Sequence, residues 1–190
     1  MIVVLDDDAA ERRLRAGGLR CGCGGRLRPW RHARVRSVRC FDGRLDRRRP
    51  RRGRCVGCGR SQVLVPSGWL PRRAHAVETV GVVLLAAAAG QGHRTIARSV
   101  QLPGDTVRGW LRRATRGAEW LRAVAVAFAA QADPQFVPPP PRGRALADAV
   151  EALGSAAAAA VRRLGLAGLS PWRIIATITC GRLLALPRGS

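Results

Sequence analysis

Hydrophobic and polar residues follow different rhythms in different parts of this chain. Between residues 77 and 130, apolar residues recur every three or four positions with few breakers, which predicts helices. Residues 20–73 instead hold short alternating runs such as ARVRSV, with turn signals FDG and RPRRG, which predict small β-hairpins. The first 15 residues carry no clear signal and are compatible with a strand or a short helix.

The helical stretch predicts three helices. The first runs from about Val77 to Ala89, the second covers about Arg94–Val100, and the third begins near Gly104 after the turn QLPGD. Four apolar residues on the third helix recur at i, i+3, i+4 and i+7, a pattern that predicts one buried face. They are Val107, Trp110, Leu111 and Ala114. A short helix, a tight turn and a longer amphipathic helix are typical of a helix-turn-helix.

The rest of the chain predicts a linker and a pair of helices. The proline-rich sequence DPQFVPPPPRG (Asp133–Gly143) indicates a stiff, extended connection. Helices are expected at about Arg144–Gly165 and Ser170–Leu186, the second with Ser170 as its cap and Pro171 at its first position. Their apolar faces predict that they pack against each other, against the helix-turn-helix or against a second copy of the chain.

Two cysteine pairs lie within the predicted hairpins. Cys55 and Cys58 enclose two residues and precede Gly59, which is the usual spacing of a zinc knuckle. Cys21 and Cys23 enclose only one residue, which leaves one ligand of this pair open. We expect these four thiols to hold one structural zinc ion, which would supply folding energy that a small, charged segment cannot obtain from apolar burial.

Cys40 or His32 is an alternative to Cys21 or Cys23 as a zinc ligand. A catalytic zinc ion is not expected, because the chain has three histidines and no HExxH or HxE motif. Gly-rich phosphate loops, nucleophile constellations and paired carboxylates are also missing from the sequence. We therefore expect neither an enzyme nor a small-molecule substrate.

Positive charge dominates the composition. The 190 residues carry a net charge of +22, and all 34 basic residues are arginines. Residues 12–60 alone hold 18 arginines against Asp42 and Asp46. Such density favours contacts with nucleic-acid phosphates, for which Arg47 and Arg48 are candidates.

The polar face of the third helix is the candidate for reading bases in the major groove of DNA. Gly109 lies in mid-helix on this face, where a missing side chain would let the backbone approach the groove. Arg112 or Arg113 could then pair with guanine. The candidate DNA contacts on this helix and the one before it are Arg94, Asp105, Thr106, Arg108, Gly109, Arg112, Arg113 and Arg116.

Several segments together resemble a known group of proteins. These are CGGRLRPW, RCVGCGRSQVLVPSGWLPRRA, GHRTIARSVQLPGDTVRGWLRR and SPWRIIATITCGRLLA. They resemble uncharacterised actinobacterial zinc-ribbon and helix-turn-helix proteins, which are similar to the N-terminal DNA-binding regions of insertion-sequence transposases. The resemblance covers roughly residues 20–120 and the last helix, and it implies DNA binding by analogy. The acids beyond residue 120 are too few for a transposase catalytic domain, so a complete transposase is not expected.

The sequence as a whole predicts an α+β protein of four segments. These are a β-hairpin zinc ribbon (16–73), a three-helix helix-turn-helix domain (74–130), a linker (131–143) and a C-terminal helical hairpin (144–190). The expected partner is double-stranded DNA, bound by a regulator or a transposase-derived module that could form a homodimer. The alternatives are a structured-RNA-binding protein, or an accessory protein whose C-terminal helices dock a partner.

The expected location is the cytoplasm, in association with the nucleoid. MIVVLDDD places acids after a short apolar start, unlike a signal peptide. The longest apolar run, Thr79–Ala89, is too short to cross a bilayer, so no membrane association is expected. In a reducing compartment, paired cysteines indicate metal ligands rather than disulfides.

Overall fold

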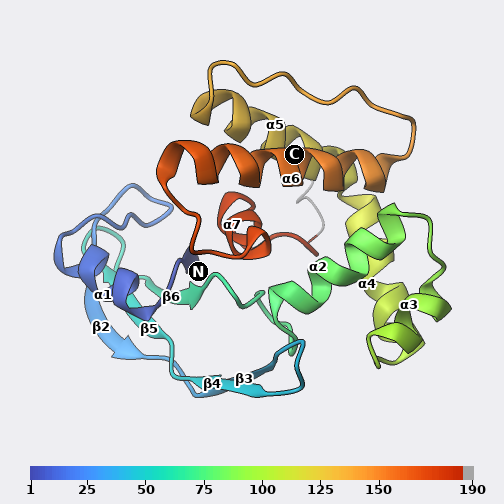
Figure 1. The fold of residues 1–190 in the computed structure, drawn as a ribbon. Coiled ribbons are helices and arrows are strands. Elements are labelled where there is room, and N and C mark those ends of the chain that lie inside the picture. Colours follow the sequence, from blue (N-terminus) through green and yellow to red (C-terminus); the bar gives the residue numbers. More distant parts are fainter. Residues whose placement is uncertain (186–190) are drawn as a thin grey trace. The chain divides into compact units, whose positions relative to one another are not determined.

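The computed structural model describes residues 1–185, in which seven helices and six strands form the α+β fold that the sequence predicts (Figure 1). Contacts divide the chain into two compact units, Met1–Ala76 and Val77–Ser190. The first unit holds all six strands and one helix, and the second holds the other six helices. Among the described residues, no helix combines the length and the apolar character needed to cross a membrane.

The N-terminal unit is built on a four-stranded sheet with the strand order β1-β6-β5-β2. β1 runs parallel to β6, whereas β6, β5 and β2 are antiparallel neighbours. A separate antiparallel hairpin consists of β3 and β4. The elements of this unit are β1 (Ile2–Val4), α1 (Asp7–Arg15), β2 (Leu27–His32), β3 (Arg36–Arg39), β4 (Leu45–Arg48), β5 (Arg51–Cys55) and β6 (Ser61–Pro66).

The first 15 residues form both a strand and a helix. Asp6 caps α1 by accepting a hydrogen bond from the Ala9 N–H at 2.6 Å. α1 packs closely on β5, since a Cβ on Gly53 would lie 2.9 Å from Leu14 Cδ2. Glu11 of α1 also forms an ion pair with Arg51 of β5 at 2.8 Å. This segment therefore belongs to the same unit as the cysteine pairs, whereas the predicted boundary lay at residue 16.

The β3–β4 hairpin is anchored by one tryptophan. Trp69 is 1% exposed, packs with Val38, and donates a hydrogen bond from Nε1 to Asp46 Oδ2 at 2.8 Å. The guanidinium of Arg36 lies over the Trp69 ring, 5.5 Å from its centre. These contacts fix one face of the hairpin against the unit and leave the other face, which carries Arg47, exposed.

The C-terminal unit is entirely helical. Its elements are α2 (Val77–Ala88), α3 (His93–Ser99), α4 (Gly104–Arg116), α5 (Ala118–Ala132), α6 (Ala145–Leu164) and α7 (Pro171–Ile178). Three of the four residues of the predicted stripe on α4 are buried, and Leu111 is partly buried. The expected count of three helices up to residue 130 is one too low, because Gly117 separates α4 from α5.

The last helix is shorter than predicted. α7 ends at Ile178, and the chain turns through Cys180 (φ 50°) and Gly181 (φ 72°), both in the left-handed region. The Gly181 N–H bonds back to the Ala176 carbonyl at 2.7 Å and closes the helix. The predicted end at Leu186 lies outside the described residues.

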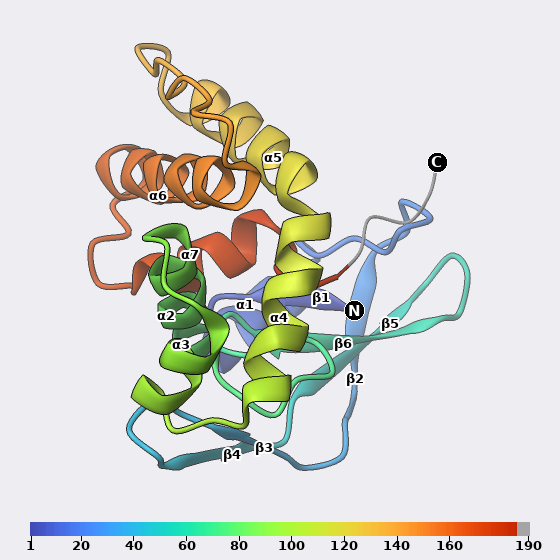
Figure 2. The ribbon, with the colours of Figure 1, turned by 90° about the vertical axis from the view of Figure 1, so that its right-hand side faces the viewer.

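The C-terminal helices pack within the helical unit. α5 and α6 lie side by side, and α7 contacts both α6 and α2 (Figures 1 and 2). Small buried residues on the facing helices, such as Ala125 and Ala156, allow a close approach. The proline-rich connection is tied to both α5 and α6, because Arg122 donates to the Pro139 carbonyl and the Arg142 N–H donates to Asp148.

Asp133 joins the end of α5 to the end of α6. This buried carboxylate accepts hydrogen bonds from Arg162 at 3.1 Å and from Arg163 at 2.8 Å. The hydrogen bonds from Arg163 and then Arg162 hold the pKa of Asp133 below its ordinary value.

Replacing Asp133 should change the acid stability of the protein. A lowered folded-state pKa means that this group stabilises the fold above the unfolded pKa of about 3.9, and that the stabilisation is lost as the pH falls through the lower folded value. We expect Asp133→Asn to lower the free energy of unfolding at neutral pH and to reduce the loss of stability on acidification, as measured by urea unfolding across the acid range. Asp105→Asn is the control, because the Asp105–Arg108 pair is exposed and should contribute little. Equal effects of the two substitutions would contradict this role for Asp133.

Gly81 and Gly154 should respond oppositely to alanine. A Cβ on Gly81 in α2 would overlap the ring of Trp172 in α7, whereas a Cβ on Gly154 in α6 meets nothing within 4 Å. We expect Gly81→Ala to destabilise the protein by about 1–3 kcal/mol through overpacking. Gly154→Ala should stabilise it by about 0.5–1 kcal/mol, because alanine loses less backbone entropy in a helix. Thermal and urea unfolding of both variants will test this, and a neutral Gly81→Ala would contradict the packing of α7 on α2.

Candidate metal centre

Four cysteines from the two predicted pairs meet at one point in the N-terminal unit. One ligand atom from each of Cys21, Cys23, Cys55 and Cys58 lies within 4.8 Å of every other. The Sγ atoms of Cys21 and Cys58 are 3.7 Å apart, and those of Cys23 and Cys55 are 3.5 Å apart. A tetrahedral metal with bonds of about 2.3 Å to sulfur requires sulfur–sulfur separations of about 3.8 Å. The cluster therefore fits a four-coordinate metal ion.

The first cysteine pair lies on a tight loop before β2. The Gly24 N–H donates to the Cys21 carbonyl at 2.8 Å, and the Cys21 N–H donates to the Gly25 carbonyl at 2.9 Å. Gly24 has a φ of 83°, which favours glycine at this point of the turn. These bonds turn the chain within five residues, so the short Cys21–Cys23 spacing still brings both sulfurs into the cluster.

The second cysteine pair lies on the turn between β5 and β6. Cys55 exchanges backbone hydrogen bonds across this turn, donating to the Arg60 carbonyl at 2.9 Å and accepting from the Gly59 N–H at 3.1 Å. Gly59 has a φ of 68°, as the glycine after the second cysteine of a knuckle requires. The Cys58 N–H points at Cys55 Sγ at 3.5 Å, which places a backbone dipole beside a prospective thiolate.

The thiols perturb one another. A hydrogen bond with the Cys23 backbone lowers the pKa of Cys21 to about 6, although burial opposes this. A hydrogen bond with the Cys58 backbone likewise lowers the pKa of Cys55. The pKa of Cys58 is raised to about 11: a backbone hydrogen bond with Arg60 lowers it, but the neighbouring cysteine thiols outweigh that bond. Such a cluster favours the thiolate form at some of the four cysteines. A bound cation would neutralise their negative charge and would favour deprotonation of the remaining thiols.

The cluster does not include either alternative ligand. Cys40 lies in the turn between β3 and β4, where its N–H bonds to the Arg44 carbonyl at 2.8 Å. His32 is exposed at the end of β2. Sequence reasoning missed Gln62, whose side-chain amide lies 3.7 Å from Cys21 Sγ. Only the pairing of β5 with β6, which places Gln62 opposite Gly53, brings it near the cluster.

The predicted DNA-contacting residues of α4 fall into two groups. Arg112 and Arg116 are exposed, and neither forms an ion pair with any described residue. Four others are engaged within the helix: Arg108 pairs with Asp105 at 3.0 Å, and Arg113 donates to the Gly109 carbonyl at 3.1 Å. Thr106 is partly buried. A Cβ on Gly109 would lie 3.2 Å from Arg113 Nη1, so this side chain, rather than open space, adjoins the glycine.

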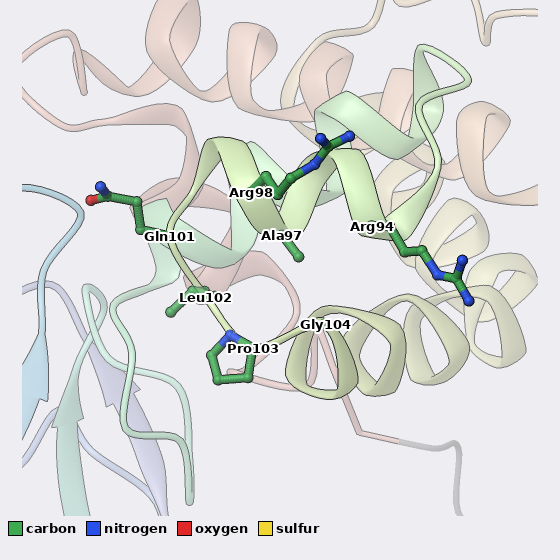
Figure 3. A pocket seen from close by; sticks show the side chains of 7 residues that line it. All are labelled: Arg94, Ala97, Arg98, Gln101, Leu102, Pro103 and Gly104. Atoms are coloured by element: carbon green, nitrogen blue, oxygen red, sulfur yellow. The ribbon is translucent and has the colours of Figure 1, made fainter.

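A shallow depression of about 710 Å³ lies between α3 and the start of α4 (Figure 3). Ala97, Leu102 and Pro103 form its apolar part, and Arg94 and Arg98 stand at its rim. Figure 3 shows that the two guanidinium groups point in different directions, so they do not converge on a single anion. Arg94 is exposed and free to contact an extended partner.

The two arginines predicted to hold phosphates differ in their surroundings. Arg48 pairs with Asp46 at 2.8 Å and with Asp7 at 3.2 Å. Arg47 is exposed on the opposite face of the hairpin and forms no ion pair with the residues described here. Arg39 and Leu45 lie opposite each other in the register, on the same exposed face as Arg47. Arg48 is therefore engaged in two exposed ion pairs, whereas Arg47 forms none with the described residues.

No protein-family model, curated protein or solved structure matches this chain.

Gly25 should be essential for metal binding. A Cβ at this position would lie 2.6 Å from Cys55 Sγ and 3.5 Å from Cys23 Sγ, inside the space of the sulfur cluster. We expect Gly25→Ala to lose most of the bound metal, as Cys55→Ser should, in metal analysis of the purified protein. Gly22→Ala in the same loop is the control, because its Cβ would meet nothing within 4 Å. Full metal content in Gly25→Ala would contradict the arrangement of the two loops.

Proposed function

We propose that this chain is a DNA-binding protein whose N-terminal unit is organised by one structural zinc ion. The observation that carries the proposal is that the N-terminal unit holds both a cluster of four thiols and exposed arginines on its strands. Four cysteines fill every position of a tetrahedral site, which leaves none open for a substrate or an activated water. This ligand set is typical of structural zinc and gives the metal a role in folding.

The support for duplex DNA comes from helices α2, α3 and α4. α3 and α4 contact each other and both contact α2, and a turn with Gln101 in the left-handed region joins them. α4 buries Val107, Trp110 and Ala114 on one face and carries arginines on the other. An arrangement of this kind would act as a helix-turn-helix, with α4 in the major groove.

A division of labour between two kinds of arginine follows from this proposal. Arg112 is exposed on α4, where a bidentate contact with guanine N7 and O6 would discriminate between sequences. Arg39 and Arg47 are exposed on the β3–β4 hairpin, away in sequence from the helix proposed to enter the major groove. These would hold phosphates and contribute affinity without sequence preference.

The two groups of arginines should give different binding defects. We expect Arg112→Ala to cost about 1–3 kcal/mol on a selected duplex and much less on a scrambled one. Arg39→Ala combined with Arg47→Ala should weaken binding to both duplexes equally and should flatten the salt dependence. Binding isotherms at several salt concentrations will measure both effects.

Arg108→Ala is a suitable control, because Arg108 is paired with Asp105 on the same helix and should matter less than Arg112. Equal losses on both duplexes for Arg112→Ala would show that α4 does not read sequence. Failure of the wild-type protein to bind any duplex would refute the proposed function.

A further inference from the structure

The sheet of the N-terminal unit is covered by α1 on one face. On the other face Val63 and Val65 of β6 pack with Trp69, whereas the part formed by β2 and β5 is basic. α1 packs on the face that carries Leu27, Gly53 and Cys55. The alternating residues Arg28, Arg52 and Arg54 point to the other face, and Arg28 lies directly opposite Arg54 in the register of β2 and β5. Like charges placed directly opposite each other across strands destabilise a sheet. A bound polyanion would relieve this repulsion.

An exposed tryptophan lies on β2, at the edge of this basic region. Trp30 is 42% exposed, and the guanidinium of Arg54 lies 4.8 Å from its ring centre. Arg31 lies over the same ring at 5.5 Å. Of the five tryptophans, all within the described residues, Trp30 alone belongs to the exposed class. Trp30 is therefore not a core residue, and a base that stacks on the ring face covered by Arg54 would displace that guanidinium toward a phosphate.

The backbone that carries Trp30 is held in place. Arg51 donates a hydrogen bond to the Trp30 carbonyl at 2.8 Å and also forms the ion pair with Glu11 of α1. β2 is the edge strand of the sheet, and its register shifts between Pro29 and His32. The ring is therefore presented from a fixed strand at an open edge.

We infer that this face binds single-stranded DNA by stacking an unpaired base on Trp30, while Arg28, Arg31 and Arg54 contact the adjacent phosphates. An aromatic side chain in a basic groove is the arrangement by which proteins hold single strands without strong sequence preference. Base pairs within a duplex are stacked on their neighbours, so they offer no free face to the indole ring. The inference extends the proposed DNA-binding function from duplex to a locally unpaired strand, and it rests on that function for the choice of DNA as partner.

The test uses the full-length, metal-loaded protein and four probes: an oligothymidylate, an oligouridylate of the same length, a strand of that length with abasic sugars, and a duplex. Trp30→Ala should weaken oligothymidylate binding by about 5- to 150-fold, the range that corresponds to loss of one stacked base. Trp30→Phe should restore most of the affinity, because it retains an aromatic face. The abasic strand should bind the wild type and Trp30→Ala equally, because it offers phosphates and no base.

Tryptophan fluorescence gives a second, direct readout. Oligothymidylate should quench part of the wild-type emission, and that quenching should be absent from Trp30→Phe, in which the four less exposed tryptophans remain. Metal content and far-ultraviolet circular dichroism of each variant should match the wild type, since Trp30 lies at the surface.

Several outcomes would overturn the inference. Equal affinity of the wild type and Trp30→Ala for oligothymidylate would exclude base stacking, and so would a Trp30-dependent loss on the abasic strand. A Trp30-dependent preference for an RNA strand over the DNA strand would overturn the choice of DNA. If the protein binds no duplex sequence-specifically but still binds oligothymidylate through Trp30, the proposed role of α4 is refuted and the inference about Trp30 is retained.

Discussion

The meeting of four cysteine sulfurs is the constraint on which the N-terminal unit depends. Cys21 and Cys55 belong to the same buried cluster as Leu14, Leu27 and Leu64, so the sulfur site and the apolar core are one structure. The loops that carry the cysteines are separated by β2, the β3–β4 hairpin and β5. A metal ion would bind both loops only in the folded state, so its binding free energy would add to the folding free energy that a small core supplies.

Arginine serves two purposes in this unit, and the ion pairs separate them. Arg36, Arg48 and Arg51 are tied to Trp69, to Asp46 and to Glu11, where they connect the hairpin and α1 to the rest of the unit. Other arginines on the outward faces of β2–β5 and β3–β4 remain exposed. Those are Arg28, Arg31, Arg39, Arg47 and Arg54. The net charge by itself cannot make this distinction, because it counts every arginine equally.

The helical unit is held together by contacts between residues far apart in the chain. Gly81 admits the Trp172 ring against α2, and Asp133 receives Arg162 and Arg163 from the end of α6. The Ser170 hydroxyl, which caps α7, also donates to Glu78 at 2.9 Å. These contacts link α7 to α2 and α6 to the end of α5. Because α2 and α5 both contact α4, the C-terminal part of the chain supports the arginine-bearing helix within one unit.

Local patterns in the sequence were sufficient for the bounds of α2 and α3 and for recognising the two cysteine pairs as candidate metal ligands. The bounds predicted for α2, α3 and the start of α4 lie within one residue of those observed, because apolar periodicity, Gly90 after α2 and Pro103 before α4 act over a few residues. The cysteine pairs were identified as one candidate metal site because knuckle spacing is also a local property. The early end of α7 was missed, since the turn at Cys180 and Gly181 departs from an apolar pattern that continues beyond it.

Only the tertiary structure decided which long-range partners each residue has. β1 could not be predicted, because its strand exists through pairing with β6 some sixty residues away, from Ile2↔Leu64 to Val4↔Pro66. The choice of Cys21 and Cys23 over Cys40 and His32 required the fold of both loops. Strand register likewise decides that Arg47 and Arg48 lie on opposite faces of the hairpin. It also decides that Trp30 lies at the surface beside Arg31 and Arg54. A one-residue shift in register moves a side chain to the opposite face of a sheet, and composition and local pattern do not determine that register.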